Sequence, residues 1–310
     1  MRTGLLRTAE RAAEIGASAL QIFSDNPTAW RRRTWPHPEI DAFRERLEAA
    51  DIAPLAIHAS YLINLAGTDP IYHDRSIDLL AAELETARRI GARFVNVHIG
   101  SHGGAGADIG IERLVDAVAQ ALGRDGSSQS QPKTDPTITL ENSAGGGFGL
   151  GVDPDELERI AAALEPAGIP RERVAFCLDT AHAWGAGHDL SDPDAADRLL
   201  ADLDAAIGLD RVPLIHLNDS KFERGSRMDR HEHIGAGRIG EAGMAHLLRH
   251  PDLAHATYIL ETPGMEDGYD AINLERAQRL ALGEPLAPLP PGALTLKGSR
   301  ARAATPADPG

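Results

Sequence analysis

The 310-residue chain has a single cysteine, Cys177, and no long apolar run. One cysteine excludes an internal disulfide, and its place within an apolar segment predicts an inert, buried thiol. No segment approaches the ~18 apolar residues that a membrane span needs, and the first residues lack the apolar stretch of a secretory signal. These absences predict a cytoplasmic protein that does not contact a membrane.

Acidic residues outnumber basic residues, with 46 Asp and Glu and 31 Lys and Arg, which gives a net charge of −15. Taken alone, this charge argues against nucleic acid, because proteins that bind phosphates are usually basic. The sum can mislead, because carboxylates that bind metal cations count as negative and yet build a positive site. The local arrangement of charge therefore matters more than the total.

Short, nearly continuous apolar segments predict strands that are buried on both faces of a parallel sheet. They are residues 19–24, 55–60, 94–100, 137–142, 175–180, 213–219 and 258–262. Amphipathic segments alternate with them, and no dinucleotide-binding fingerprint is present, which favours a TIM (β/α)8-type barrel over an open sheet. Such a barrel has eight strands, so we expect the first strand to be missing or truncated.

Local signals define the helices and the domain. Asp153-Pro154 and Asp192-Pro193 predict helix starts, with a capping carboxylate before a proline in the first turn, and Gly91 and Gly168 predict helix ends. We expect a single barrel domain over residues 1–284. Residues 285–310 contain six prolines and few apolar residues, which is typical of a disordered tail.

Six of the seven predicted strands end on a potential metal ligand, and a barrel brings such ends to one face. The strand-end residues are His58, His98, Glu141, Asp179, His216 and Glu261. Three further candidates, His182, Asp229 and His231, follow two of these strands. Nine donors exceed the four to six that one ion takes and suffice for two or three ions, if a carboxylate bridges them.

Each candidate also has a simpler interpretation. A lone histidine at a strand end is more often a hydrogen-bonded structural group, and the pairs Asp179-x-x-His182 and Asp229-x-His231 are weak signals alone. Glu141 and Glu261 are stronger, because an unpaired carboxylate that ends a buried strand is costly. The joint pattern favours metal binding. Histidines in polar surroundings are instead predicted to lie at the surface: His37, His73, His250 and His255.

Several segments resemble the endonuclease IV family, which repairs apurinic/apyrimidinic (abasic) sites in DNA. They are residues 57–65, 97–102, 140–142, 178–183, 216–221, 229–235 and 259–263, and the most specific is Asp-Arg-His-Glu-His-Ile-Gly at 229–235. The resemblance runs from about Leu5 to Leu282. It implies a trinuclear zinc site, with Mn²⁺ as an alternative in some positions. By resemblance, His58 and His98 hold one ion, Glu141 bridges it to a second ion with Asp179, His216 and Glu261, and His182, Asp229 and His231 hold the third.

The implied activity is hydrolysis of the phosphodiester 5′ to an abasic site in damaged duplex DNA, leaving a 3′-hydroxyl and a 5′-deoxyribose phosphate. By resemblance, Glu141 is the catalytic carboxylate that bridges the ions activating the attacking hydroxide. Tyr61 and Leu62 would insert into the DNA at the lesion, and Arg230 would contact it. The family also implies a monomer.

Two alternatives remain open. One is a two-metal sugar isomerase or epimerase of the same barrel fold, which would have no evident use for the third group of ligands. The other is a catalytically impaired protein that binds damaged DNA without cutting it, because the short N-terminus puts barrel closure in doubt. An arginine expected after the second strand of the family is unmatched, since Thr28 occupies its place, although a basic run at residues 31–33 lies nearby.

Overall fold

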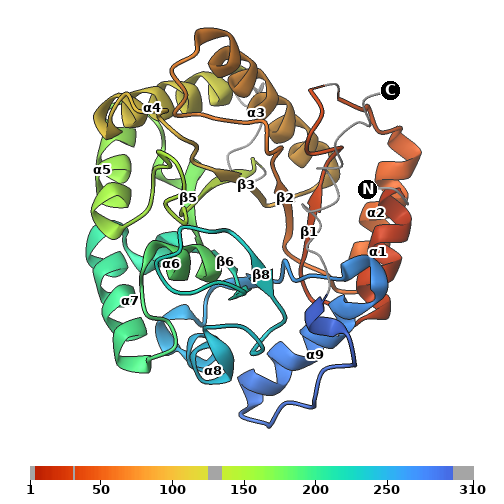
Figure 1. Cartoon of the computed structure of the whole chain (residues 1–310). Helices are drawn as coiled ribbons and strands as arrows, with labels where there is room; N and C mark the ends of the chain where they lie inside the picture. Colours follow the sequence, from red (N-terminus) through yellow and green to blue (C-terminus); the bar gives the residue numbers. More distant parts are fainter. Residues whose placement is uncertain (1–3, 31, 125–134, 296–310) are drawn as a thin grey trace, which may run out of the picture.

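The computed structural model describes residues 4–30, 32–124 and 135–295, and Figure 1 shows a ring of helices around parallel strands. Each strand pairs with the next strand of the sheet in chain order. The strands are β1 (Leu20–Phe23), β2 (Leu55–His58), β3 (Phe94–His98), β4 (Thr137–Glu141), β5 (Val174–Asp179), β6 (Leu214–His216) and β9 (Thr257–Ile259). The structure therefore confirms the predicted parallel (β/α) barrel.

The outer ring consists of helices that precede or connect the strands. In the part of the chain that the structure describes they are α1 (Leu5–Glu14), α2 (His37–Ala49), α3 (Pro70–Ile90), α4 (Ala107–Arg124), α5 (Pro154–Leu164), α7 (Pro193–Ile207), α8 (Gly240–Arg249) and α9 (Tyr269–Leu282). None of these helices has the length and apolar character that crossing a membrane requires.

Shorter elements complete the chain between the main helices and strands. Helix α6 (Thr180–Ala186) follows β5 directly, and β7 (Asp219–Ser220) pairs with β8 (His231–Glu232) as a small antiparallel ladder. Both lie over the centre of the ring in Figure 1. Single 3-10 turns are η2 (Arg171–Arg173), η3 (Leu209–Arg211), η4 (Pro251–Leu253), η5 (Met265–Asp267) and η6 (Ala293–Thr295).

The barrel has an opening between β1 and β9. Among the described residues, β1 pairs with β2 and β9 pairs with β6, so these two strands form the edges of the sheet. An eighth strand would stand between them, as the prediction of a missing first strand requires. The Gln21 side chain of β1 spans this gap, because its Nε2 donates to Glu261 Oε1 at 2.9 Å. Its Oε1 lies 3.1 Å from Nε2 of His216.

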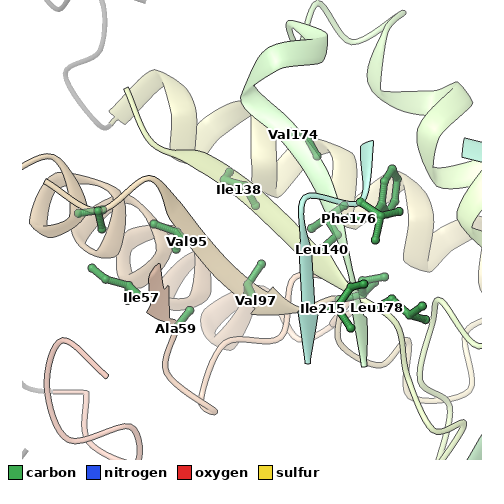
Figure 2. Packing of buried hydrophobic residues seen from close by; sticks show 14 of the residues in the cluster. Ile57, Ala59, Val95, Val97, Ile138, Leu140, Val174, Phe176, Leu178 and Ile215 are labelled. Carbon is green, nitrogen blue, oxygen red and sulfur yellow. The ribbon is translucent and has the colours of Figure 1, made fainter. Parts of the chain in front are cut away.

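Apolar side chains of neighbouring strands form the core between the sheet and the helices. Figure 2 shows Val95, Ile138 and Phe176 on three adjacent strands, and all three are at most 1% exposed. Leu80 and Leu84 of α3 are fully buried beside them in the same cluster. Burying one such side chain contributes about 1.5–3 kcal/mol, which holds the strand ends in fixed positions.

The predicted helix signals are confirmed at three positions. Asp153 caps α5, because its Oδ1 accepts from the Glu156 amide at 2.9 Å. Asp192 caps α7, because its Oδ1 accepts from the amides of two residues in the first turn. Gly91 ends α3 in the left-handed conformation, with a φ of 80°, which costs glycine little because it has no Cβ.

The first part of the predicted tail contacts the barrel. Arg276 Nη1 donates to the Ala287 carbonyl at 2.8 Å, and Arg279 Nε donates to the Pro285 carbonyl at 2.9 Å. His233 Nε2 lies 3.2 Å from the carbonyl oxygen of Ala293, a residue that is buried. The disordered tail predicted for residues 285–310 therefore begins with residues that pack on α9, and residues 296–310 lie outside the described part of the chain.

Two local predictions were wrong. His73 is buried, not at the surface, because its Nε2 lies 3.0 Å from the Leu65 carbonyl and 3.1 Å from the Arg113 carbonyl. The strand predicted for residues 213–219 ends at His216. Asp219 then turns into the ladder of β7 and β8, where its carboxylate accepts from the amides of Gly237 and Ile239.

Replacing Asp153 by Ala removes the side-chain acceptor at the start of α5. We expect Asp153→Ala to lower the free energy of unfolding by about 1 kcal/mol, because one amide of the first turn loses its partner. Urea denaturation measures this change. Asp155→Ala is the matched control, since Asp155 is an exposed acid in the same turn. Equal losses in the two variants would contradict the capping role.

Candidate metal centre

Neighbouring strands end in register at one face of the barrel, and this places the predicted ligands side by side. His98 is the register partner of Glu141 across β3 and β4, and Asp179 is that of His216 across β5 and β6. His58 is the last residue of β2. Because carboxyl ends of parallel strands meet at one face, five strands deliver one donor each to the same place.

The Glu141 carboxylate lies at the centre of these side chains and is 1% exposed. Its Oε2 lies 3.4 Å from His98 Nε2 and 3.7 Å from His58 Nε2. Its Oε1 lies 3.1 Å from His182 Nδ1 and 3.5 Å from His216 Nδ1. The two oxygens of one carboxylate therefore face two different pairs of imidazoles, which is the arrangement that a bridging ligand requires.

Three groups of donors could each hold a metal ion, and in each group the donor atoms all lie within 4.8 Å of one another. They are His58 with His98 and Glu141, then Glu141 with Asp179 and His216, and then Asp179 with His182 and His231. Neighbouring groups share a carboxylate, Glu141 in one case and Asp179 in the other. The arrangement therefore forms a continuous chain of sites.

The two remaining predicted ligands lie at the edge of these groups. Glu261 Oε2 lies 3.3 Å from His216 Nδ1. Asp229 Oδ1 lies 3.1 Å from His231 Nε2 and 3.5 Å from His182 Nε2. The structure thus brings all nine sequence-predicted donors together. The third group differs from the prediction in one detail, because the carboxylate that groups with His182 and His231 within the 4.8 Å limit is Asp179 and not Asp229.

Backbone carbonyls orient three of the imidazoles. The Nδ1 atoms of His58, His182 and His231 lie 2.8–2.9 Å from the carbonyl oxygens of Ala59, Asn142 and Glu261. A proton on Nδ1 donates to the carbonyl and leaves Nε2 as the free lone pair, as in histidines that bind metal. His216 is held the other way round, because its Nε2 faces Gln21 and its Nδ1 faces the acidic groups.

Unpartnered buried atoms indicate that the donor set fits a cation. Glu141 Oε1, His216 Nδ1 and His231 Nε2 are buried and have no hydrogen-bond partner among the described residues. A buried polar atom without a partner costs about 1–3 kcal/mol. All three belong to the three donor groups, and the imidazole and carboxylate donors are those that zinc and similar transition ions prefer. Cations held in these groups would supply the partners that the three atoms lack.

The acidic and basic side chains also shift one another's pKa values. Burial alone would raise the pKa of Glu141, but the charges of His98 and His216 hold it well below its usual range. Burial alone would lower the pKa of His231, but the Asp229 carboxylate, 3.1 Å from its Nε2, and the charge of Asp179 raise it to about 9. Shifts of this kind cluster at functional sites.

Three amide side chains, which the sequence interpretation missed, fix the carboxylates. Asn96 Nδ2 donates to Glu141 Oε2 at 2.6 Å, and Asn218 Nδ2 donates to Asp179 Oδ2 at 2.7 Å. Gln21 contacts Glu261 and His216 across the opening of the barrel. Gln21 and Asn96 are polar residues inside predicted apolar strands, which could have marked them as candidates but does not indicate their partners. Asn218 is followed by polar residues at a strand end and has no such signal.

The residues expected to contact DNA lie at the rim of this centre. Tyr61 is 39% exposed, and its ring centroid lies 5.3 Å from that of His58 and 5.8 Å from that of His98. Leu62 is half-buried against the core. Arg230 is exposed, and its Nη1 donates to the Asp229 carbonyl at 2.6 Å. An exposed ring and an exposed cation thus flank the donor groups.

The basic run at residues 31–33 has internal partners. Arg32 Nη1 lies 2.8 Å from Glu83 Oε1, and the Arg33 guanidinium lies 4.0 Å from the centroid of the Trp35 ring. Position 31 lies outside the described residues. Arg32 and Arg33 are thus engaged within the protein, and Arg230 lies next to the proposed ligands Asp229 and His231.

Comparisons with known proteins agree with the fold. The family model described as "Xylose isomerase-like TIM barrel" matches residues 9–282. The chain is 39% identical over 275 residues to a "Probable endonuclease 4" of Methanoculleus marisnigri, covering 89% of this chain and 94% of that relative.

Solved structures extend the comparison. The crystal structure of endonuclease IV from Thermus thermophilus superposes with a TM-score of 0.78 and 36% sequence identity, covering 91% of this chain and 96% of that one. A D-tagatose 3-epimerase-like protein superposes with a TM-score of 0.62 and 17% identity, covering 90% of this chain and 97% of that one. At that identity, the epimerase likeness shows the barrel fold alone.

The shifted pKa values predict that metal binding releases protons. In the metal-free protein His231, with a pKa of about 9, carries a proton at neutral pH, and a histidine must be neutral to bind a cation. We expect the affinity for Zn²⁺ to fall as the pH decreases from about 9 to 6. Calorimetric titration with Zn²⁺ in two buffers of different ionisation enthalpy measures the release. A binding heat that is the same in both buffers would contradict the prediction.

Proposed function

Because the chain belongs to the endonuclease IV family, we propose that it is a metal-dependent apurinic/apyrimidinic endonuclease. The proposed reaction is hydrolysis of the phosphodiester 5′ to an abasic site in duplex DNA, which leaves a 3′-hydroxyl and a 5′-deoxyribose phosphate. The observation that carries the proposal is the chain of three donor groups joined by shared carboxylates at the barrel mouth.

The proposed cofactor is zinc, with three ions per chain and Mn²⁺ as an alternative in some positions. His58 and His98 would hold the first ion, and Glu141 would bridge it to the second. The second would also take the residues Asp179, His216 and Glu261, and the third would take His182, Asp229 and His231. Zinc in such a site supplies a Lewis acid for the phosphate and lowers the pKa of a bound water towards neutrality.

The side chains of this protein have separate tasks in the proposed reaction. Glu141 is held as a carboxylate by its low pKa and by the Asn96 amide, so it stays negative at the pH of the reaction. The Tyr61 ring lies beside His58. Tyr61 and Leu62 would enter the DNA stack at the lesion, where the missing base lowers the cost of opening the helix. Arg230 would bind a phosphate next to the centre.

The third donor group favours a nuclease over a sugar isomerase or epimerase. A two-metal sugar enzyme does not need His182, Asp229 and His231 in addition to the first two groups. The identity of 36–39% to the endonuclease relatives against 17% to the epimerase-like protein supports the same choice. An impaired DNA-binding protein is less well supported, since the missing strand removes none of the nine donors and Gln21 still links the two barrel edges.

The proposal also covers the oligomeric state, the location and the active domain of the protein. All nine donors come from one chain, so a monomer can form the complete centre. We propose the cytoplasm as its location, because the substrate is genomic DNA, and residues 1–284 as the barrel domain that carries the activity.

The zinc-loaded protein should cut an abasic duplex on the 5′ side of the lesion and leave an intact duplex uncut. A DNA polymerase should extend the product, because the cut leaves a 3′-hydroxyl. Dialysis against a strong zinc chelator should abolish cutting, and Zn²⁺ should restore it. Gel electrophoresis of end-labelled duplexes measures both effects. Tight binding to the abasic duplex without any cut would favour the impaired DNA-binding protein instead.

Glu141→Gln should reduce cutting at least about 100-fold, because an amide cannot bridge two cations as a carboxylate does. The number of bound Zn²⁺ ions per chain should fall in the same variant, while the circular dichroism spectrum stays that of the wild type. Glu158→Gln is the matched control, because Glu158 is exposed on α5. Wild-type cutting by Glu141→Gln would rule out the bridging role.

A further inference from the structure

A second cluster of metal-binding side chains lies on the outer ring, between α7 and α8. These two helices are neighbours in Figure 1, and the cluster consists of Asp197 from α7 with His246 and His250 from the end of α8. Asp197 Oδ1 lies 2.5 Å from His246 Nε2 and 3.3 Å from His250 Nε2. None of the three residues belongs to the groups at the barrel mouth.

The geometry of this cluster suits a cation. The three donor atoms lie within 4.8 Å of one another, and both histidines point the same type of nitrogen at one carboxylate oxygen. His246 lies in the last turn of α8, and His250 is the residue that directly follows the helix, four positions later. The carboxylate comes from a different helix, so an ion held here would join the two.

The surroundings of the cluster leave room for water ligands. His246 and His250 line a hollow of about 480 Å³, and their side chains are 25% and 12% exposed. Arg249 lines the same hollow, but its Nε donates to the Ala245 carbonyl at 3.0 Å. The chain as a whole carries a net charge of −15, which favours the approach of a cation over an anion.

We propose that Asp197, His246 and His250 form an additional cation site, which takes Zn²⁺ and fastens α7 to α8. Two imidazoles and a carboxylate suit a transition ion, whereas Ca²⁺ and Mg²⁺ prefer sets made of oxygen alone. The open positions would be filled by water. This site is independent of the proposed nuclease activity, because it uses no residue of the barrel mouth.

One hydrogen bond must be given up when the ion binds. His250 Nδ1 accepts from the Asp252 amide at 3.3 Å. A neutral imidazole that binds a cation through Nε2 carries its proton on Nδ1, so it can no longer accept there. Because this bond is lost and the site is partly exposed, we expect the site to fill at higher free Zn²⁺ than the centre at the barrel mouth.

The test is to count Zn²⁺ ions per chain by equilibrium dialysis over a series of free Zn²⁺ concentrations. The wild type should bind about one ion more than His246→Gln and Asp197→Asn, and the missing ion should be the weakest. Asp197→His should keep the extra ion, because imidazole replaces the carboxylate as ligand. His37→Gln is the matched control, since His37 is an exposed histidine on α2 outside every donor group.

The experiment compares the number of Zn²⁺ ions per chain in the wild type with the number in each variant. This difference does not depend on how many ions bind at the barrel mouth. His246→Gln should keep its circular dichroism spectrum and, if the nuclease proposal holds, its cutting of abasic DNA. Equal Zn²⁺ counts in the wild type, His246→Gln and Asp197→Asn would overturn the additional site and leave the cluster as an ordinary ion pair. A loss of the ion in His37→Gln would overturn it as well.

Discussion

The Glu141 carboxylate is almost completely buried, and its two oxygens face two separate pairs of histidines. Burying an ionised group without compensation costs several kcal/mol, so this side chain can remain charged only if positive charge surrounds it. In the metal-free protein, protons on the neighbouring imidazoles supply part of that charge, because nearby acidic groups raise the pKa values of His182 and His216 against the effect of burial. Cations in the same places would replace the protons.

The barrel fold brings together acidic and basic side chains that would otherwise repel one another or remain solvated. Parallel strands in register deliver His98 beside Glu141 and Asp179 beside His216, and the buried apolar residues below them prevent the strands from separating. Asn96 and Asn218 then fix the carboxylates at distances of 2.6 and 2.7 Å. The packed apolar residues fix the positions of the ligands, and the amides fix the orientations of the carboxylates. Neither the apolar residues nor the amides alone would produce the site.

The sequence predicts the strands and the nine donors well because both have strong local signals. A strand buried on two faces is apolar throughout, so a His or Glu at its end is conspicuous. The roles of Gln21 and Asn96 have no such local signal, because their partners, Glu261 and Glu141, lie 240 and 45 residues away. His73 and His250 look alike in sequence, yet one is buried by distant carbonyls and the other meets Asp197 across two helices. Only tertiary structure separates such cases.

Gln21 contacts the proposed metal ligands Glu261 and His216 across the opening of the barrel. Metal binding to these ligands therefore affects how firmly the two edges of the sheet are held together. β1 and β9 are joined there by a side chain and not by backbone pairs in the described part of the chain. Glu261 and His216 are thus both proposed ligands and anchors of this seam. Whatever immobilises Glu261 also restrains the two edge strands, so loading of the centre and rigidity of the seam are thermodynamically linked.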